Sequence, residues 1–258
     1  MNKYTFIILQ YKMIKHFILF TLLLILIIFY ISISKITKIT KIDLVISRYN
    51  ETLDWLYKID TTNINVICYN KNIKKFNHPK VNRVIDLPNV GKCDNTYLYH
   101  IIENYDKLND ITIFAPGSCD MNEKWGQFIN TYSKAIYFKK SIFQTSKHIN
   151  VKNDLYDFTL DNYETANIEN RNMNNEVKTQ LCSIRPFGKW YESKFGKLEI
   201  KHITYKGIFA VSKNDIHKRS KCFYKELINE LMTSNPESGH FIERSWIAIF
   251  NPNKECLY

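Results

Sequence analysis

Short apolar runs alternate with helix-forming segments along most of the chain, and this alternation limits the fold more than any other feature of the sequence. A short helix is expected at residues 52–58, and a longer one begins at Asp94, its predicted cap. A succession of this kind predicts an α/β fold in which helices flank a mixed, largely parallel sheet. In such sheets, ligands bind beyond the carboxyl ends of the strands, where the strand order switches. The predicted strands cover residues 43–47, 64–69, 81–87 and 110–115.

The second half of the chain carries a weaker version of the same pattern. Residues 139–180 are rich in Asn, Asp, Lys and Thr, which predicts a helical or irregular insertion. An apolar strand is expected around Gly207, and Ser212 and Asp215 form the pattern of a capping box for the helix that follows. A last helix is predicted to include residues 240–250.

The amino-terminal part of the chain contains an apolar segment, residues 17–34, that carries no charge and has lysines on both sides. This length suffices to cross a bilayer, and the small-residue exit of a cleaved signal peptide is missing, so we predict an uncleaved single-pass membrane anchor. The lysines on both sides leave the orientation open, with a slight preference for an amino terminus in the cytosol. The predicted divisions are a tail at residues 1–16, the anchor, a basic stem at residues 35–42 and an α/β domain at residues 43–258.

The amino-acid composition limits which kinds of ligand or macromolecule this protein is expected to bind. Hydrophobic residues make up 45% of the 258 residues, enough for a sizeable core. The formal net charge is +11, but the basic residues are scattered among Asn and Ile and form no stripe, so nucleic acid is not an expected partner. The six cysteines include no CxxC pair, which argues against a structural zinc site.

Several segments resemble known families. The stretch LVISRYNE at residues 44–51 resembles the first strand and following loop of GT-A glycosyltransferases, particularly the large inverting family 2. NVICYNKN at residues 65–72 is similar to their second strand. DITIFAPGSCD at residues 110–120 stands where those enzymes carry a strand followed by an Asp-x-Asp metal motif. The resemblance implies a GT-A-like, Rossmann-like fold and a nucleotide-sugar donor.

A closer resemblance, covering most of the chain after residue 43, is to domain of unknown function family 3431, which is found in membrane-anchored proteins. The matching segments occur in the order expected for that family. They are RYNE at residues 48–51, LPNVG at 87–91, TYLYHI at 96–101, the stretch 102–114, GIFAVS at 207–212 and ERSW at 243–246.

The resemblance implies a nucleotide-sugar site at the strand ends. Arg48 could contact a phosphate in a bidentate manner, Tyr49 could stack on the base and Asn50 could donate to it. For Tyr49 the alternative is simple packing, and for Asn50 it is a helix cap. Asn70 has an equal claim as a turn former, and Gly207 could bring backbone close to the sugar or mark a strand kink. The full predicted donor set is Arg48, Tyr49, Asn50, Glu51, Asn70, Asp94 and Gly207.

The metal motif departs from the family pattern. GT-A enzymes hold a Mn or Mg ion with paired carboxylates, whereas the corresponding stretch here, Pro116 to Asp120, contains a single acid. Three interpretations follow. Asp120 could suffice together with water and donor phosphates, lysine and arginine could replace the metal, or catalysis could have been lost.

The last helix supplies the predicted catalytic residues. His240 shares a helical face with Glu243 and Arg244, which follow at spacings of three and four. Glu243 is the candidate general base that deprotonates the acceptor hydroxyl, and Arg244 would orient it or contact the diphosphate. The alternative for these residues is a structural salt bridge. The sequence therefore predicts a membrane-anchored glycosyltransferase-like protein acting on a glycan, protein or lipid acceptor, or a catalytically inactive binding or structural protein with the same fold.

Overall fold

The computed structural model describes residues 13–28, 40–145, 155–162, 179–197, 200–251 and 253–258. The chain divides into two compact units, Met1–Thr40 and Lys41–Tyr258. In the first unit, residues 13–28 form a helix whose large apolar side chains are exposed. Of the helices described, none has both the length and the apolar character needed to cross a bilayer. Residues 29–34 of the predicted anchor lie outside the described part of the chain, and the anchor stays a prediction.

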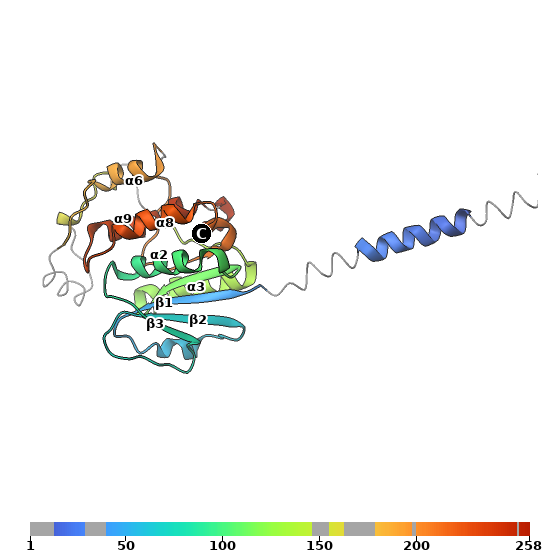
Figure 1. Ribbon diagram of the computed structural model, residues 1–258, viewed down its shortest axis with the longest axis horizontal. Helices are drawn as coiled ribbons and strands as arrows, with labels where there is room; N and C mark the ends of the chain where they lie inside the picture. Colours follow the sequence, from blue (N-terminus) through green and yellow to red (C-terminus); the bar gives the residue numbers. More distant parts are fainter. Residues whose placement is uncertain (1–12, 29–39, 146–154, 163–178, 198–199, 252) are drawn as a thin grey trace, which may run out of the picture. The chain divides into compact units, whose positions relative to one another are not determined.

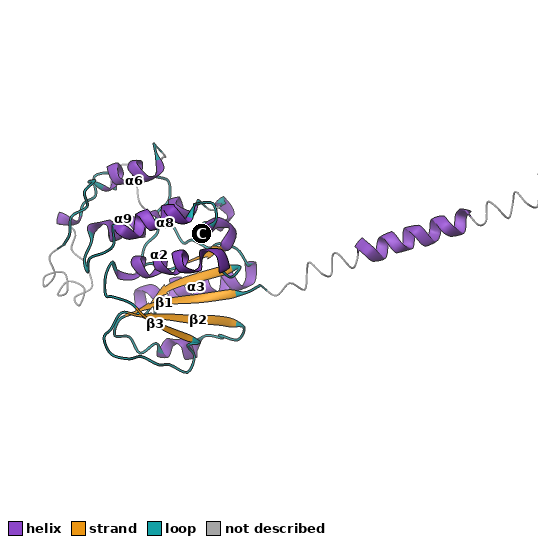
Figure 2. Cartoon of the chain, in the orientation of Figure 1, coloured by secondary structure: helices purple, strands orange, loops and turns teal. Residues whose placement is uncertain are grey.

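The second unit is built on a five-stranded sheet with the order β3-β2-β1-β4-β5 (Figure 2). The first four strands pair in parallel, and β5 pairs antiparallel with β4. The predicted mixed, largely parallel α/β sheet is therefore confirmed. The strands are β1 (Ile42–Arg48), β2 (Ile64–Asn70), β3 (Arg83–Asp86), β4 (Ile111–Pro116) and β5 (Phe209–Ser212).

Helices cover both faces of this sheet, and Figure 1 shows α2, α8 and α9 stacked over one of them. The hydrophobic core on that face includes residues of α2, α6, α8 and α9, and the core on the opposite face includes residues of α3 and the 3₁₀ helix η1. The helices are η1 (Asp54–Lys58), α2 (Lys92–Asn104), η2 (Tyr105–Lys107), α3 (Asn122–Phe138), η3 (Leu160–Asn162), α6 (Phe187–Phe195), α7 (Lys213–Ile216), α8 (Lys221–Asn229), α9 (Glu237–Phe250) and η4 (Lys254–Cys256).

Alternating side chains of β1 supply both hydrophobic cores. Val45 packs with the aromatic residues of α2 and α9, whereas Leu44 and Ile46 pack with those of η1 and α3. Successive strand residues point to opposite faces, and parallel sheets are covered on both, so a continuous apolar run is what such a central strand requires. On the α9 side, Trp246 and Phe250 stack with their ring centroids 5.4 Å apart.

The strand order creates a switch point beside β1. The chain passes from β1 to β2 and β3 on one side, and β4 then returns to the other side of β1. Crossovers that leave in opposite directions open a crevice at the carboxyl ends of the two central strands. The residues that follow β1 and β4 therefore lie where a ligand of such a sheet would bind.

Several predicted elements differ from the observed ones at their ends. The helix expected at residues 52–58 is the shorter η1, and β5 begins at Phe209, after the predicted Gly207. The predicted capping of α2 by Asp94 is wrong, because α2 begins at Lys92 with Gly91 at its cap position. The amide of Asp215 does donate to Ser212 Oγ at 3.1 Å, but this cap opens the short α7.

Two helices, α3 and α6, were not expected from the sequence. In α3 the buried residues Phe128, Thr131, Tyr132 and Ala135 do fall on one helical face, but a glycine and β-branched residues weaken the pattern. Much of the predicted insertion, residues 146–154 and 163–178, lies outside the described part of the chain.

Gly91 provides a test of the turn that opens α2. Its φ is +57°, and an added Cβ would lie 2.6 Å from the carbonyl oxygen of Leu231, so Gly91→Ala should lower the free energy of unfolding by about 1–3 kcal/mol or more. Gly126→Ala is the matched control. In the described structure a Cβ there meets no atom within 4 Å, and the change should raise stability by roughly 0.5–1 kcal/mol. Urea unfolding followed by tryptophan fluorescence measures both, and equal effects would contradict the assignment.

Candidate functional site

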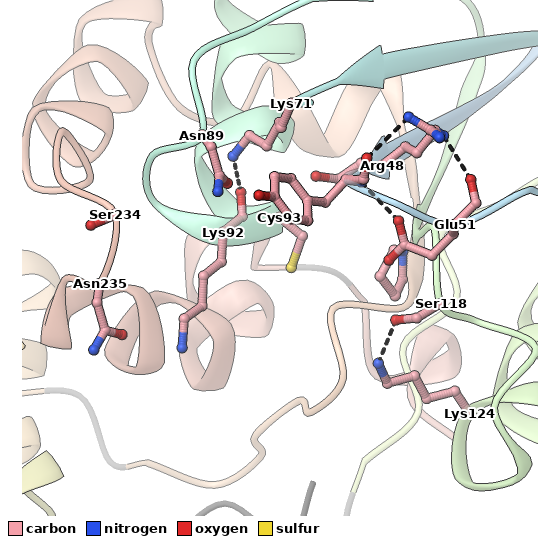
Figure 3. A pocket seen from close by; sticks show the side chains of 13 residues that line it. Arg48, Glu51, Lys71, Asn89, Lys92, Cys93, Ser118, Lys124, Ser234 and Asn235 are labelled. Carbon is pink, nitrogen blue, oxygen red and sulfur yellow. Dashed lines mark hydrogen bonds between the residues drawn. The ribbon is translucent and has the colours of Figure 1, made fainter. Parts of the chain in front are cut away.

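A cavity of about 270 Å³ lies at the carboxyl ends of the parallel strands, beside the start of α2 (Figure 3). Its lining comes from the ends of β1 and β4, the loops after β1, β2, β3 and β4, the first turns of α2 and α3, and the segment before α9. The residues are Ser47, Arg48, Tyr49, Glu51, Lys71, Asn89, Lys92, Cys93, Pro116, Ser118, Lys124, Ser234 and Asn235.

Arg48 organises the loop that follows β1. Its Nε donates to the Glu51 carbonyl at 2.7 Å, and its Nη1 donates to the Tyr49 carbonyl at 3.0 Å and to Asn70 Oδ1 at 2.6 Å. The guanidinium also lies 3.7 Å from the centre of the Phe76 ring, within cation–π distance. These contacts give Arg48 a role in shaping the loop, and its predicted phosphate contact stays a prediction.

Glu51 folds back on the same loop. Its Oε2 accepts from the amides of Tyr49 at 2.8 Å and Asn50 at 3.1 Å. A Cβ at Gly117 would lie 2.8 Å from this carboxylate, so the missing side chain there lets the two loops approach. Asn50 is exposed and accepts from Asn72 Nδ2. Hydrogen bonds within the loop therefore constrain the segment that was predicted to bind the donor.

Asn70 is fully buried at the end of β2. Its Nδ2 donates to the carbonyls of Asn72 and Lys74, both at 3.0 Å, and to Asp86 Oδ1 at 2.9 Å. Of the two roles considered for Asn70, the contacts favour the turn former, since its amide is satisfied by protein groups.

Lys71 stabilises the turn at the start of α2 through hydrogen bonds to its backbone carbonyls. This buried lysine donates through Nζ to the carbonyl of Val90 at 2.5 Å and to that of Lys92. Burial lowers the pKa of Lys71 to about 8. Gly91 and Lys92 both have positive φ, 57° and 50°, which is strained for a lysine by about 1–3 kcal/mol. The ammonium of Lys71 holds this strained turn, and the turn orients Lys92.

Lys92 extends from the start of α2 towards α9, as Figure 3 shows. Its Nζ lies 3.3 Å from His240 Nε2. Burial, together with the positive charges of Lys92 and Arg244, lowers the pKa of His240 to about 3. The imidazole is therefore neutral at pH 7 and can accept from the ammonium. Burial also lowers the pKa of Lys92, and the carboxylate of Glu243 partly opposes this effect.

Asp94 is buried behind Lys92 in the first turn of α2. Its Oδ1 accepts from Trp246 Nε1 at 2.9 Å, which joins α2 to α9. Burial and the nearby negative charge of Glu243 raise the pKa of Asp94 to about 7. The Cys93 thiol, 3.7 Å from Asp94 Oδ2, has its pKa raised well above the usual value by burial, so it stays protonated.

The predicted catalytic residues of α9 contact one another. Arg244 Nη1 donates to the His240 carbonyl at 2.9 Å and lies 3.7 Å from Glu243 Oε2. The Arg244 side chain is buried over the Phe158 ring, 4.2 Å from its centre, away from the cavity lining. Glu243 accepts from the Lys206 amide at 2.8 Å, and its side chain is 24% exposed. It is therefore the more accessible of the two charged groups.

Gly207 and Asp120 differ in how close they lie to the cavity. Gly207 has a φ of +62°, and an added Cβ would lie 2.9 Å from Cys93 Sγ, so the glycine lets the chain pack directly behind the cavity wall. Asp120 is exposed and lies outside the lining. Over the described ranges of the chain, no group of three or more His, Cys, Asp or Glu side chains is arranged to hold a metal ion. The donor set implied by an Asp-x-Asp motif does not fit these residues.

Sequence reasoning missed three lysines of the lining, Lys71, Lys92 and Lys124. The signal for two of them was present, since Lys71 directly follows a predicted strand and Lys92 lies in the loop before a predicted helix. Lys124, whose Nζ donates to Ser118 Oγ at 2.8 Å, lies on the unpredicted α3.

Asp94 gives the α2–α9 contact a pH dependence. A carboxyl group whose pKa is raised in the folded state contributes most to folding stability at pH values below its unfolded-state pKa. For Asp94 that contribution is lost as the pH rises through its folded-state pKa of about 7. Asp94→Asn keeps an acceptor for Trp246, so it should raise the free energy of unfolding by about 1–4 kcal/mol at pH 8 and by much less at pH 4. Melting curves at both pH values measure this, with the exposed Asp106→Asn as control. A gain independent of pH would contradict the prediction.

Comparison with known proteins places the chain in one family. The family "Protein of unknown function (DUF3431)" matches residues 44–257, nearly the whole second unit. No curated protein and no solved structure was found to match. The resemblance to this family seen in the RYNE, LPNVG and ERSW segments is thereby confirmed. The chain belongs to the DUF3431 family.

Proposed function

We propose that the cavity binds a nucleotide sugar and that the protein transfers the sugar to a glycan, protein or lipid acceptor. The observation that carries the proposal is the charge of the cavity. Among the described residues of its lining, Arg48, Lys71, Lys92 and Lys124 are basic and Glu51 alone is acidic. The Glu51 carboxylate already accepts from two backbone amides. An anion is therefore the ligand that this cavity favours electrostatically.

The position of the cavity supports a phosphorylated ligand. It lies at the carboxyl ends of parallel strands, at the strand-order switch, where open α/β sheets bind their ligands. Lys92 and Cys93 belong to the first turn of α2, whose backbone amides and dipole attract negative charge. The exposed ring of Tyr49 lies in the same lining and is available for contact with a base.

Glu243 is the proposed general base of the transfer. In an inverting reaction it takes the proton of the acceptor hydroxyl, while the acceptor oxygen bonds to the anomeric carbon and the bond from that carbon to the diphosphate breaks. The basic residues of the cavity then compensate the charge that develops on the departing diphosphate. The partial exposure of the Glu243 side chain, and its proximity to Lys92, support this role.

A second candidate function, from a different class, is a catalytically inactive binding or structural protein with the same cavity. Three of the predicted site residues favour it, because Arg48, Glu51 and Asn70 form hydrogen bonds that fix loops. Both functions require binding of the same ligand, but only the transferase turns the donor over.

A Glu243→Gln variant tests the assignment. Binding of UDP-glucose and GDP-mannose to the full chain in detergent, measured by calorimetry, should be nearly unchanged, whereas transfer or hydrolysis of the donor should fall by roughly 10²- to 10⁴-fold. The exposed Glu226→Gln on α8 is the control for loss of a carboxylate. A parent chain that binds donor without any turnover supports the inactive alternative, and a parent that binds neither donor contradicts the proposal.

The membrane anchor belongs to the same proposal. Exposed apolar side chains on residues 13–28 and the uncharged stretch at residues 17–34 support insertion into lipid. The full chain should therefore remain in the membrane pellet after alkaline carbonate extraction. A variant with Leu24 and Ile25 replaced by lysines should be extracted more readily, because charges near the bilayer centre oppose insertion. Release of the unaltered chain would contradict the anchor.

A further inference from the structure

We infer that the diphosphate of the donor is held by Lys92 and Lys124 without a divalent cation. The inference rests on the proposed function and names the groups that replace the metal of a typical GT-A site. Both lysines line the cavity, and they reach it from different helices, α2 and α3 (Figure 3).

Among the described residues, no carboxylate lies within ion-pair distance of either lysine, although Glu243 is near enough to Lys92 to oppose part of the decrease in its pKa. Lys92 Nζ contacts the neutral His240 ring at 3.3 Å, and Lys124 Nζ donates to the hydroxyl of Ser118 at 2.8 Å. Elsewhere in the described structure, three basic side chains are paired with carboxylates at 2.5–2.7 Å. They are Arg185 with Glu237, Lys194 with Glu230 and Lys218 with Asp215.

The location of the two lysines in their helices is unfavourable without an anion. Lys92 is the first residue of α2, and Lys124 lies in the first turn of α3, which begins at Asn122. Helix amino-terminal ends carry partial positive charge, so cations placed there are repelled. A diphosphate in the cavity would reverse this effect, since it would attract both ammonium groups and both helix ends.

The turn at Lys92 is also constrained by its neighbours. The lysine sits in a left-handed conformation that Lys71 and Gly91 impose. Strained conformations of this kind persist where the surrounding structure fixes them, and they are frequent at ligand sites. A backbone turn fixed in this way loses less conformational freedom on binding.

The carboxylates near the cavity also argue against a bound divalent cation. Magnesium and manganese prefer several oxygen ligands, commonly including carboxylates. Asp120 is exposed and lies outside the lining, and the Glu51 carboxylate is bound by the amides of Tyr49 and Asn50. In the cavity, therefore, lysine ammonium groups supply the positive charge that a metal ion supplies in a typical GT-A site.

Calorimetry of the full chain in detergent tests the inference, with inorganic pyrophosphate and UDP as probes, in EDTA and in excess manganese. Both probes should bind in EDTA at least as tightly as in manganese. Lys92→Gln and Lys124→Gln should each weaken binding by roughly tenfold or more, because each removes a charge-assisted hydrogen bond. Lys92→Arg should retain much of the affinity. The control is Lys225→Gln, an exposed lysine of α8, which should bind like the parent.

The outcomes separate this inference from the proposed function. Binding of UDP that requires manganese and is lost in Asp120→Asn would overturn the lysine site and leave the sugar-donor proposal standing. Pyrophosphate binding in EDTA without any binding of UDP would support the lysine site and contradict the nucleotide-sugar proposal. Failure of both probes to bind in either condition would overturn both. Melting temperatures of the variants, measured in parallel, identify any loss of binding that comes from unfolding.

Discussion

The structure depends on β1 being buried on both faces between two parallel neighbours. Its register aligns Arg48 with Asn70 of β2 and Ser47 with Pro116 of β4, so three strands end at the same edge of the sheet. Everything that follows those strands is therefore brought together, including the RYNE loop, Lys71 and Ser118. A strand that must be apolar on both sides can offer polar groups only at its ends. The cavity is a direct result of that restriction.

The cavity is surrounded by groups whose charge is set by burial. Desolvation lowers the pKa of Lys71 and Lys92 and raises that of Asp94, so each charged group depends on its neighbours for compensation. The contact between Trp246 and Asp94 carries this dependence from α2 to α9. An anion bound among the lysines would favour their charged forms and strengthen the arrangement.

The sequence predicted the strands and the sheet well, because a buried strand needs a continuous apolar run and leaves a clear pattern. The starts of the helices were harder to predict. Asp94 has the side chain of a cap, but its burial against Trp246 places it inside the first turn, while Gly91 makes the turn through its backbone. The cavity lies at the edge of the sheet where the sequence placed a site, and three of the predicted residues, Arg48, Tyr49 and Glu51, line it. The role of each residue in the cavity depends on its hydrogen-bond partners, as the contacts of Arg48 with the Tyr49 and Glu51 carbonyls show. The spacing of residues along the sequence does not reveal such partners.

In the proposed membrane-anchored transferase, the exposed Asn50 would link the chemistry of the loop to the side of the membrane on which it lies. Asn50, Glu51 and Thr52 form the acceptor sequence for N-linked glycosylation, and both neighbours of Asn50 line or border the cavity. In the proposed transferase, a glycan attached there, between two residues of the lining, would compete with the acceptor for space. Topology in the membrane would then act as a form of control, since the same polypeptide would present an open entrance on the cytosolic side and a sugar-covered one in the secretory lumen.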